Sequence, residues 1–145
     1  MNKANHYLIT LADRVNIYHI MVFALCCRVI ALITLPTLHF GDAHTYQLAG
    51  WQLFHGQSMN FKVMPLYPII SFLSGGGWRQ LLVDCILSSL TVGLIYKISL
   101  KIFHNSTAAI ISSLYAAIYP FFIFYAISGL SETSNIFFLC LSFYC

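Results

Sequence analysis

Residues 17–38 read IYHIMVFALCCRVIALITLPTL, an apolar run of 22 residues with one charged side chain, Arg28. An α-helix rises about 1.5 Å per residue, so this run covers a hydrocarbon core about 30 Å thick. It is too long for the apolar region of a signal peptide, and no small-x-small cleavage site follows it. The run therefore predicts a retained membrane-spanning helix, with Pro36 favouring a stop or bend near its end.

Arg28 lies in the middle of this predicted span. A charged side chain at membrane depth is costly, so it normally faces protein or a wet cavity and has a partner. The chain has four acidic residues, and one of them, Asp84, also lies in an apolar run. We therefore predict an intramembrane pair between Arg28 and Asp84 with a structural role.

The composition is that of a membrane protein. Hydrophobic residues make up 59% of the 145 residues and charged residues 8%, whereas a soluble domain carries about 25% charged residues. The seven Lys and Arg residues are scattered, which argues against a nucleic-acid-binding face. The five cysteines lie in apolar runs without metal-ligand or disulfide spacing, and we interpret them as small buried hydrophobes.

Three further apolar stretches complete the predicted fold. Residues 79–103 and 108–128 are long enough to cross a membrane, and Pro120 predicts a kink in the second. Residues 134–145 number only 12, whereas a span needs roughly 17 to 25. We therefore predict an all-α, polytopic membrane protein with three full transmembrane helices plus a truncated fourth, forming a single membrane domain over residues 1–145.

The longest polar interval, residues 41–68, reads GDAHTYQLAGWQLFHGQSMNFKVMPLYP. Asp42 is a good helix N-cap residue, and apolar side chains follow it at three-to-four spacing. The pattern predicts a short interfacial helix over residues 43–54, with Gly56 as its C-terminal stop.

A second short element follows within the same loop. Residues 64–73 are apolar, but Pro65 and Pro68 interrupt them and a triple glycine follows at residues 75–77. The stretch is too short to cross a membrane, so we predict a re-entrant or surface-lying element. Irregular backbone is tolerated at membrane depth only against protein or water, which favours a cavity here.

The distribution of Lys and Arg predicts the orientation, because these residues concentrate in cytoplasmic loops. A cytoplasmic N-terminus places Lys62 and Arg79 outside and the larger group, Lys3, Arg14, Lys97 and Lys101, inside. We therefore expect a cytoplasmic tail over residues 1–16 and an extracytoplasmic loop over residues 39–78. The expected location is a bacterial inner (plasma) membrane.

Several short motifs occur in a recognisable order along the chain. They are GDAHTYQLAGWQLFHG at 41–56, Pro-Leu-Tyr-Pro at 65–68, Arg-Gln at 79–80, Tyr-Pro at 119–120 and Ser-Glu-Thr at 131–133. Their order resembles the N-terminal part of GT-C glycosyltransferases of the protein O-mannosyltransferase and lipid A aminoarabinose transferase type. The resemblance covers about residue 28 to the end.

The resemblance implies transfer of a hexose or pentose from a polyprenyl phosphate on the extracytoplasmic side, with inversion at the anomeric carbon. The acceptor, whether lipid, glycan or protein, stays open. Asp42 matches the first-loop aspartate that acts as general base or orients the acceptor. Many members carry a second acid where this chain has Ala43, and the full enzymes have many more membrane helices. This chain is therefore expected to be a fragment or truncated product, incomplete or inactive by itself.

The chemistry of such a transfer selects further candidate residues. Lys62 and Arg79 could stabilise the leaving phosphate, or else anchor the loop at the interface. His44 and His55 could assist proton transfer or join Asp42 around a divalent cation, although one carboxylate with two distant histidines is a weak metal site. We therefore expect no metal or other cofactor.

The remaining candidates are one acid and three aromatic residues. Glu132 either contacts a substrate or is only a first-turn acid favoured by the helix dipole, with Ser131 as the cap. Tyr46, Trp51 and Tyr67 either stack on a sugar and line a lipid slot or are ordinary interfacial aromatics. The predicted substrate-binding set is His44, Tyr46, Lys62, Tyr67, Arg79 and Glu132.

Two other classes of function compete with the enzyme. In a small transport or channel component, Arg28, Asp84 and Glu132 would line a polar path through the membrane. In a non-catalytic membrane adaptor there would be no site. Transport predicts polar residues repeated along one face of several spans, whereas here the polar residues collect at the predicted extracytoplasmic ends.

Overall fold

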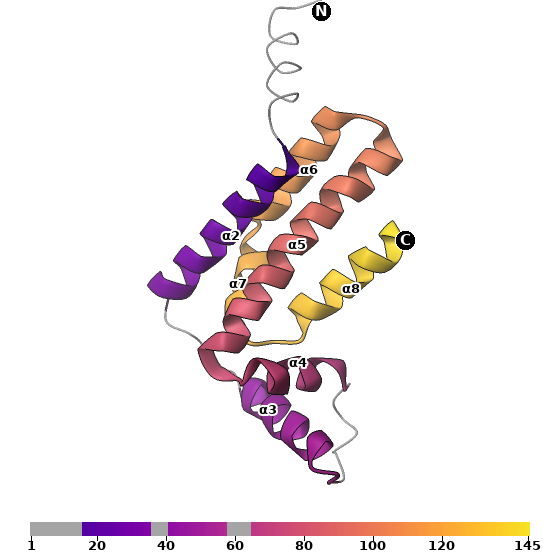
Figure 1. Ribbon diagram of the computed structural model, residues 1–145. Helices are drawn as coiled ribbons and strands as arrows, with labels where there is room; N and C mark the ends of the chain where they lie inside the picture. The colour runs from indigo at the N-terminus through magenta and orange to yellow at the C-terminus, as the bar shows by residue number, and fades with distance from the viewer. Residues whose placement is uncertain (1–15, 36–40, 58–64) are drawn as a thin grey trace, which may run out of the picture.

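The computed structural model describes residues 16–35, 41–57 and 65–145, with Gly41 and Asp42 described by their backbone alone. All regular structure in these ranges is α-helical, which confirms the predicted class. A bundle contains α2 (Ile17–Thr34), α5 (Gly77–Phe103), α6 (Ser106–Ile118), α7 (Pro120–Ser128) and α8 (Glu132–Tyr144). In Figure 1 two further helices, α3 (Gly41–Phe54) and α4 (Leu66–Ser74), lie beyond the end of the bundle where α5 begins. We call this pair the α3–α4 lobe.

Within the described residues, two helices are each long and apolar enough to cross a membrane, α2 with 18 residues and α5 with 27. Together α6 and α7 also pass this test, as one broken span bent by 48° at Pro120. The predicted kink is therefore confirmed, whereas the predicted count of three full spans plus a fourth is not. The described part of α2 ends at Thr34, and the expected last residues of this span, 36–38, lie outside the described residues.

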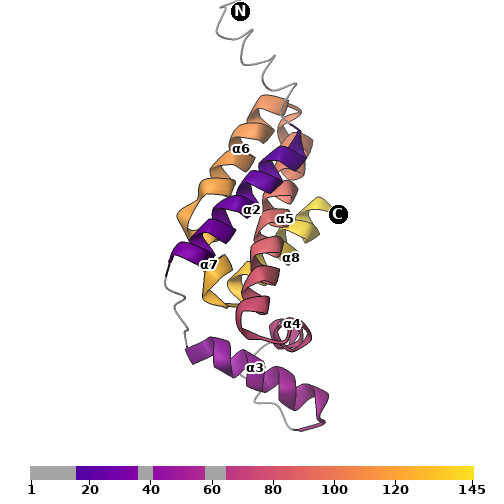
Figure 2. The same ribbon diagram turned by 60° about the vertical axis from the view of Figure 1, so that its left-hand side comes forward.

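Helix α5 is the centre of the bundle. It contacts α2, α4, α6, α7 and α8, and Figure 2 shows α2 and α8 on opposite sides of it. Gly93 lets α2 come close, because a Cβ atom at this position would lie 2.7 Å from Sδ of Met21. Nearby, Ala24 and Ala117 are completely buried. Such close packing of small residues is how membrane helices associate when lipid offers no hydrophobic driving force.

Arg28 is completely buried in this bundle but does not pair with Asp84. Its Nε donates to Oγ of Ser88 at 2.7 Å, and its two Nη atoms donate to backbone carbonyl oxygens. These carbonyls belong to Ala24 at 2.8 Å, Ala117 at 3.0 Å and Ala116 at 3.5 Å. The predicted Arg28–Asp84 pair is therefore wrong: backbone carbonyls and a serine solvate the cation.

The break at Pro120 explains why those carbonyls accept from Arg28. In a continuous helix the carbonyl of Ala116 would accept from residue 120, but proline has no N–H. Tyr119 has an extended backbone, with φ −62° and ψ 120°, so the ladder is interrupted and the last carbonyls of α6 need other donors. Arg28 supplies them, and Ser88 in turn donates to the carbonyl of Phe122 in α7 at 3.3 Å.

We predict that Arg28→Leu lowers the free energy of unfolding by about 1 to 3 kcal/mol, because it leaves buried carbonyls without donors. Thermal unfolding in detergent micelles, followed by circular dichroism, measures this loss. The cost is expected to be smaller in a Pro120→Ala background, where the backbone N–H is restored and α6 can continue into α7.

Equal costs of Arg28→Leu in both backgrounds would contradict this coupling. The double reversal Arg28→Asp with Asp84→Arg serves as a second control. Since the two side chains do not pair, the double variant is expected to be as unstable as either single variant. Recovered stability in the double variant would indicate an ion pair.

Candidate functional site

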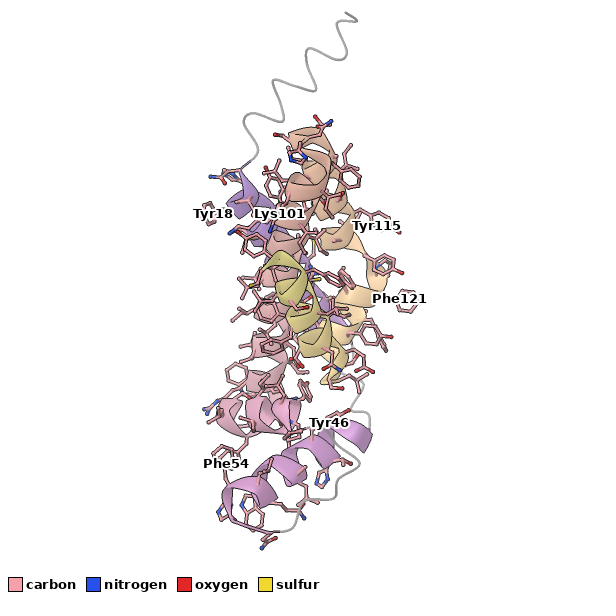
Figure 3. The ribbon with its side chains drawn as sticks, turned by 90° about the vertical axis from the view of Figure 1, so that its right-hand side faces the viewer. Tyr18, Tyr46, Phe54, Lys101, Tyr115 and Phe121 are labelled. Atoms are coloured by element: carbon pink, nitrogen blue, oxygen red, sulfur yellow. The ribbon has the colours of Figure 1, made fainter. Side chains whose placement is uncertain are left out.

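The α3–α4 lobe is held together by direct helix contact and ring stacking. A Cβ atom at Gly50 in α3 would clash with the carbonyl oxygen of Pro68 in α4, so glycine permits this close approach. Further along, the rings of Phe54 and Phe72 stack with centroids 4.3 Å apart and an interplanar angle of 15°. Figure 3 shows Tyr46 and Phe54 in this lobe, and Lys101 toward the other end of the molecule.

A buried polar network joins α4 to α5. The hydroxyl of Tyr67 donates to Oδ2 of Asp84 at 2.7 Å and accepts from Nε2 of Gln80 at 2.6 Å. Oε1 of Gln80 accepts from the hydroxyl of Ser71 at 2.7 Å. All four side chains are buried, so each bond forms where water does not compete for it. The network fixes the lobe to the first turns of α5.

Burial keeps the hydroxyl of Tyr67, the donor to Asp84, in its neutral form. Desolvation raises the pKa of Tyr67 well above its ordinary value, and the neighbouring Asp84 carboxylate raises it further. The phenol therefore retains its proton over the physiological pH range and remains the donor to Asp84.

Tyr46 links the lobe to the start of α8. Its ring meets that of Tyr67 edge-on, with centroids 4.9 Å apart, and its hydroxyl lies 3.2 Å from Oγ of Ser131. Close by, a Cβ atom at Gly129 would lie 3.4 Å from Cβ of Ala43. The first half of α3 thus lies against the turn between α7 and α8.

The structure places the predicted catalytic residue at this junction by its backbone. The helix α3 begins at Gly41, so Asp42 lies in its first turn and the predicted N-cap position is wrong. The side chain of Asp42 lies outside the described residues. Its neighbour Ala43 nevertheless puts it beside the α7–α8 turn, one residue from the contact with Gly129.

Three of the predicted substrate-binding residues meet at this junction. Tyr46 and Tyr67 touch each other, and Glu132 adjoins the Ser131 that Tyr46 contacts. His44 is exposed on α3, and Arg79 is exposed at the start of α5 with its guanidinium 5.9 Å from the ring centroid of Trp78. Lys62 lies outside the described residues.

His55 lies at the far end of α3 from Asp42. Its ring stacks on that of Trp51 at 4.1 Å, and its Nδ1 is 2.8 Å from the carbonyl oxygen of Trp51. Thirteen residues of helix separate His55 from Asp42 by about 20 Å, which is too far for one ion to bridge them. Among the described residues no group of three His, Cys, Asp or Glu could hold a metal ion.

Helix α8 begins differently from the prediction. Glu132 is in its first turn as expected, but Ser131 makes no side-chain capping bond, since it has helical backbone angles and its hydroxyl lies against Tyr46. Oε2 of Glu132 and Oγ1 of Thr133 are buried without a hydrogen-bond partner within the described ranges, as is Oδ1 of Asp84. Because they are buried, these oxygens are not exposed to a ligand at the surface of the junction.

The sequence analysis missed Gln80 and Ser71 and gave Asp84 the wrong partner. A signal was present in the spacing of Gln80, Asp84, Ser88 and Thr91, which are four, four and three residues apart and therefore share one face of α5. All four are buried. A polar stripe of this kind on a membrane helix indicates a face turned toward protein.

Comparisons with protein-family models, with characterised proteins and with solved structures found no match for this chain.

We predict that Tyr67→Phe loosens the lobe, because it removes the donor to Asp84 and the acceptor of Gln80. The local stability of α3 and α4 is expected to fall by about 1 to 2 kcal/mol. Amide hydrogen exchange followed by mass spectrometry measures this as faster exchange in both helices, with α5 and α6 unchanged in their centres. The matched control is Tyr115→Phe, since Tyr115 is 65% exposed. If α3 and α4 of Tyr67→Phe exchange their amide hydrogens at the wild-type rate, the role given to the network is contradicted.

Proposed function

We propose that this chain forms the donor-side part of a membrane glycosyltransferase of GT-C type, which moves a sugar from a polyprenyl phosphate to an extracytoplasmic acceptor. The observation that supports this most is the convergence at one end of the bundle. There the first turn of α3, with Asp42, lies beside the start of α8, with Glu132, and Tyr46 bridges the two helices. Four of the five motifs that carry the family resemblance lie at the same end, whereas Tyr-Pro at 119–120 lies at the break between α6 and α7.

In the proposed reaction Asp42 is the general base. Its carboxylate takes the proton of the acceptor hydroxyl, and the acceptor oxygen forms a bond to the anomeric carbon of the sugar. The bond between that carbon and the phosphate oxygen breaks, and its electron pair leaves with the polyprenyl phosphate. Arg79, and Lys62 in the undescribed part of the loop, would stabilise the charge on the leaving phosphate.

The other predicted residues divide by their surroundings. The exposed ring of His44 is available to bind sugar or acceptor hydroxyls, whereas Oε2 of the half-buried Glu132 is enclosed by protein. Tyr67 is 2% exposed, and its hydroxyl is already bonded to Asp84 and Gln80. We therefore assign Tyr67 a positioning role, in which it holds the ring of Tyr46 at the junction.

The proposed orientation puts the α3–α4 lobe outside the cell and the N-terminus in the cytoplasm, in a bacterial inner membrane. Supporting this, Lys97 and Lys101 lie near the end of α5 that is opposite to the lobe. Positive side chains at that end match the charge bias of cytoplasmic loops. The lobe would then meet lipid-linked sugars in the outer leaflet.

A small transport component is the second candidate, and the buried polar stripe of α5 favours it. Arg28, Asp84, Ser88 and Thr91 lie along one route through the bundle. Against a continuous path, Ser88 and Thr91 donate to the carbonyls of Phe122 and Leu87, so these hydroxyls have partners within the protein. Flux of protons or small ions into liposomes that contain the chain would support transport, whereas sugar transfer without flux would support the enzyme.

We predict that Asp42→Asn reduces transfer of labelled sugar from polyprenyl phosphate by about 10²-fold to 10⁴-fold, the usual contribution of a general base. A full-length protein that contains this chain is reconstituted in proteoliposomes and supplied with undecaprenyl phosphate linked to mannose or aminoarabinose, and label is counted in lipid, glycan and protein fractions. Binding of the donor is expected to change little, and Asp13→Asn is the matched acid control.

Binding of the donor is read separately through tryptophan fluorescence. The two tryptophans of the chain are Trp51 in α3 and Trp78 at the start of α5, so both report on the lobe end. A wild-type chain that shows neither a donor-dependent fluorescence change nor transfer would overturn the proposal. Retained transfer in Asp42→Asn would remove Asp42 from the mechanism.

The orientation is tested by thiol labelling in a chain whose native cysteines are replaced by serine. His55 and His104 are both exposed and lie near opposite ends of the structure. A membrane-impermeant maleimide is expected to label His55→Cys in intact cells and His104→Cys only after lysis. The reverse pattern would place the lobe in the cytoplasm, where the site could not reach the proposed donor in the outer leaflet.

A further inference from the structure

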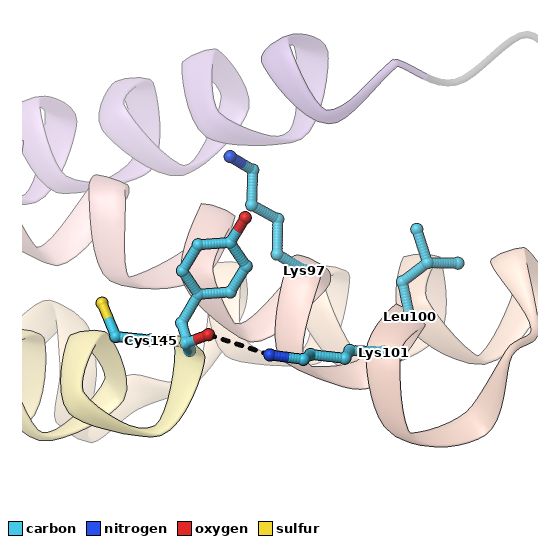
Figure 4. Close-up of a pocket in the computed structure, with 5 residues that line it drawn as sticks. Lys97, Leu100, Lys101 and Cys145 are labelled. Atoms are coloured by element: carbon cyan, nitrogen blue, oxygen red, sulfur yellow. Dashed lines mark hydrogen bonds between the residues drawn. The ribbon is translucent and has the colours of Figure 1, made fainter.

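The end of α5 away from the lobe carries two lysines around an aromatic ring. Lys97 and Lys101 are one helical turn apart and exposed, and their Nζ atoms lie 5.3 Å and 5.7 Å from the ring centroid of Tyr144 in α8. Lys101 also donates to the carbonyl oxygen of Tyr144 at 3.2 Å. Figure 4 shows this hydrogen bond, with Lys97, Lys101 and Cys145 around a pocket.

The charge of these two lysines is not balanced nearby. Neither forms an ion pair with a carboxylate within residues 16–35, 41–57 and 65–145, and Nζ of Lys97 has only the Tyr144 ring as a partner there. Asp84, the acid on the same helix, lies thirteen residues away from Lys97, or about 20 Å along the axis. The pocket between the lysines therefore has a positive potential that favours an anion.

A second feature shows which kind of anion fits. Lys97 also borders an apolar groove of about 260 Å³ that runs between α2, α5 and α8, with Met21, Leu90 and Phe137 among its walls. A cationic pocket that shares a wall with an apolar groove matches a molecule with an anionic head and a hydrocarbon tail.

We propose that Lys97, Lys101 and Tyr144 bind the phosphate of an anionic phospholipid, one of whose acyl chains lies in the groove between α2, α5 and α8. The lysines sit at the end of a membrane-crossing helix, which is the depth of lipid headgroups, and their stems can extend along the apolar surface. Free phosphate would use the lysines but leave the groove empty. This site is independent of the glycosyl transfer proposed for the opposite end.

Lipid binding is tested with the full chain in nanodiscs that contain equal amounts of phosphatidylglycerol and phosphatidylcholine. Native mass spectrometry then counts each lipid that remains bound. The wild type is expected to retain phosphatidylglycerol preferentially, and Lys97→Gln with Lys101→Gln to reduce that retention by roughly thirtyfold, the effect of two lysines near an anionic surface. The double variant Lys97→Arg with Lys101→Arg keeps the charge and is expected to retain the lipid.

Leu90→Trp tests the groove while leaving both lysines in place. It is expected to lower retention of phosphatidylglycerol, whereas competition by millimolar inorganic phosphate is expected to have little effect. Equal retention of the two lipids by the wild type would overturn the proposal, whether or not the variants fold. Unchanged retention in the glutamine variant, or full displacement by inorganic phosphate, would also overturn it. The tryptophans lie at the other end, so failure here leaves the fluorescence test of donor binding unaffected.

Discussion

The guanidinium of Arg28 occupies the place where the break at Pro120 leaves the end of α6 without backbone donors. A bent span would be costly in lipid if its freed carbonyls had no partner, and a buried cation would be costly without acceptors. The guanidinium and the freed carbonyls satisfy each other, because Arg28 donates hydrogen bonds to the carbonyls of Ala116 and Ala117. Ser88 of α5 accepts from the same guanidinium, so one side chain joins α2, α5 and α6. The arrangement of the whole bundle depends on this contact.

From this bundle α5 extends to two ends with opposite chemistry. At its first turns, Gln80 and Asp84 hold Tyr67 and through it the α3–α4 lobe, where the acids and tyrosines gather. At its last turns, two exposed lysines surround an aromatic ring. The helix therefore keeps a buried hydrogen-bonded network and exposed positive groups at opposite ends of an element that is long and apolar enough to cross a membrane. Buried Asp84 belongs to the first group, since its acceptor oxygen is held by a phenol and not by a cation.

The sequence analysis was accurate where one segment carries its own signal. The kink at Pro120 and the short helix near residues 43–54 follow from proline geometry and from local spacing, and the structure has both. The broken backbone predicted for residues 64–73 is wrong in its described part, because α4 is a continuous helix over Leu66–Ser74, with Pro68 in its first turn, where proline is tolerated. Predictions were also wrong where the partner of a residue lies on another segment of the chain. Asp84 was predicted as the partner of Arg28 because the chain has few acids. In the structure the partners include backbone carbonyl oxygens, which every residue carries, so the residue types in the sequence cannot single them out. Ser131 was expected to cap α8, but a tyrosine from α3 competes for its hydroxyl.

By itself the sequence determined the class of molecule: its apolar runs exceed what a soluble domain can bury, so its helices belong in a membrane, and polar residues within those helices must face protein. Only the tertiary structure decided which polar group meets which. In a helix bundle each buried donor and acceptor is satisfied by whatever the neighbouring helix presents at the same depth, and that depends on helix rotation and register. This is why Tyr67 rather than Arg28 is the partner of Asp84, and why the start of α3 lies beside the start of α8.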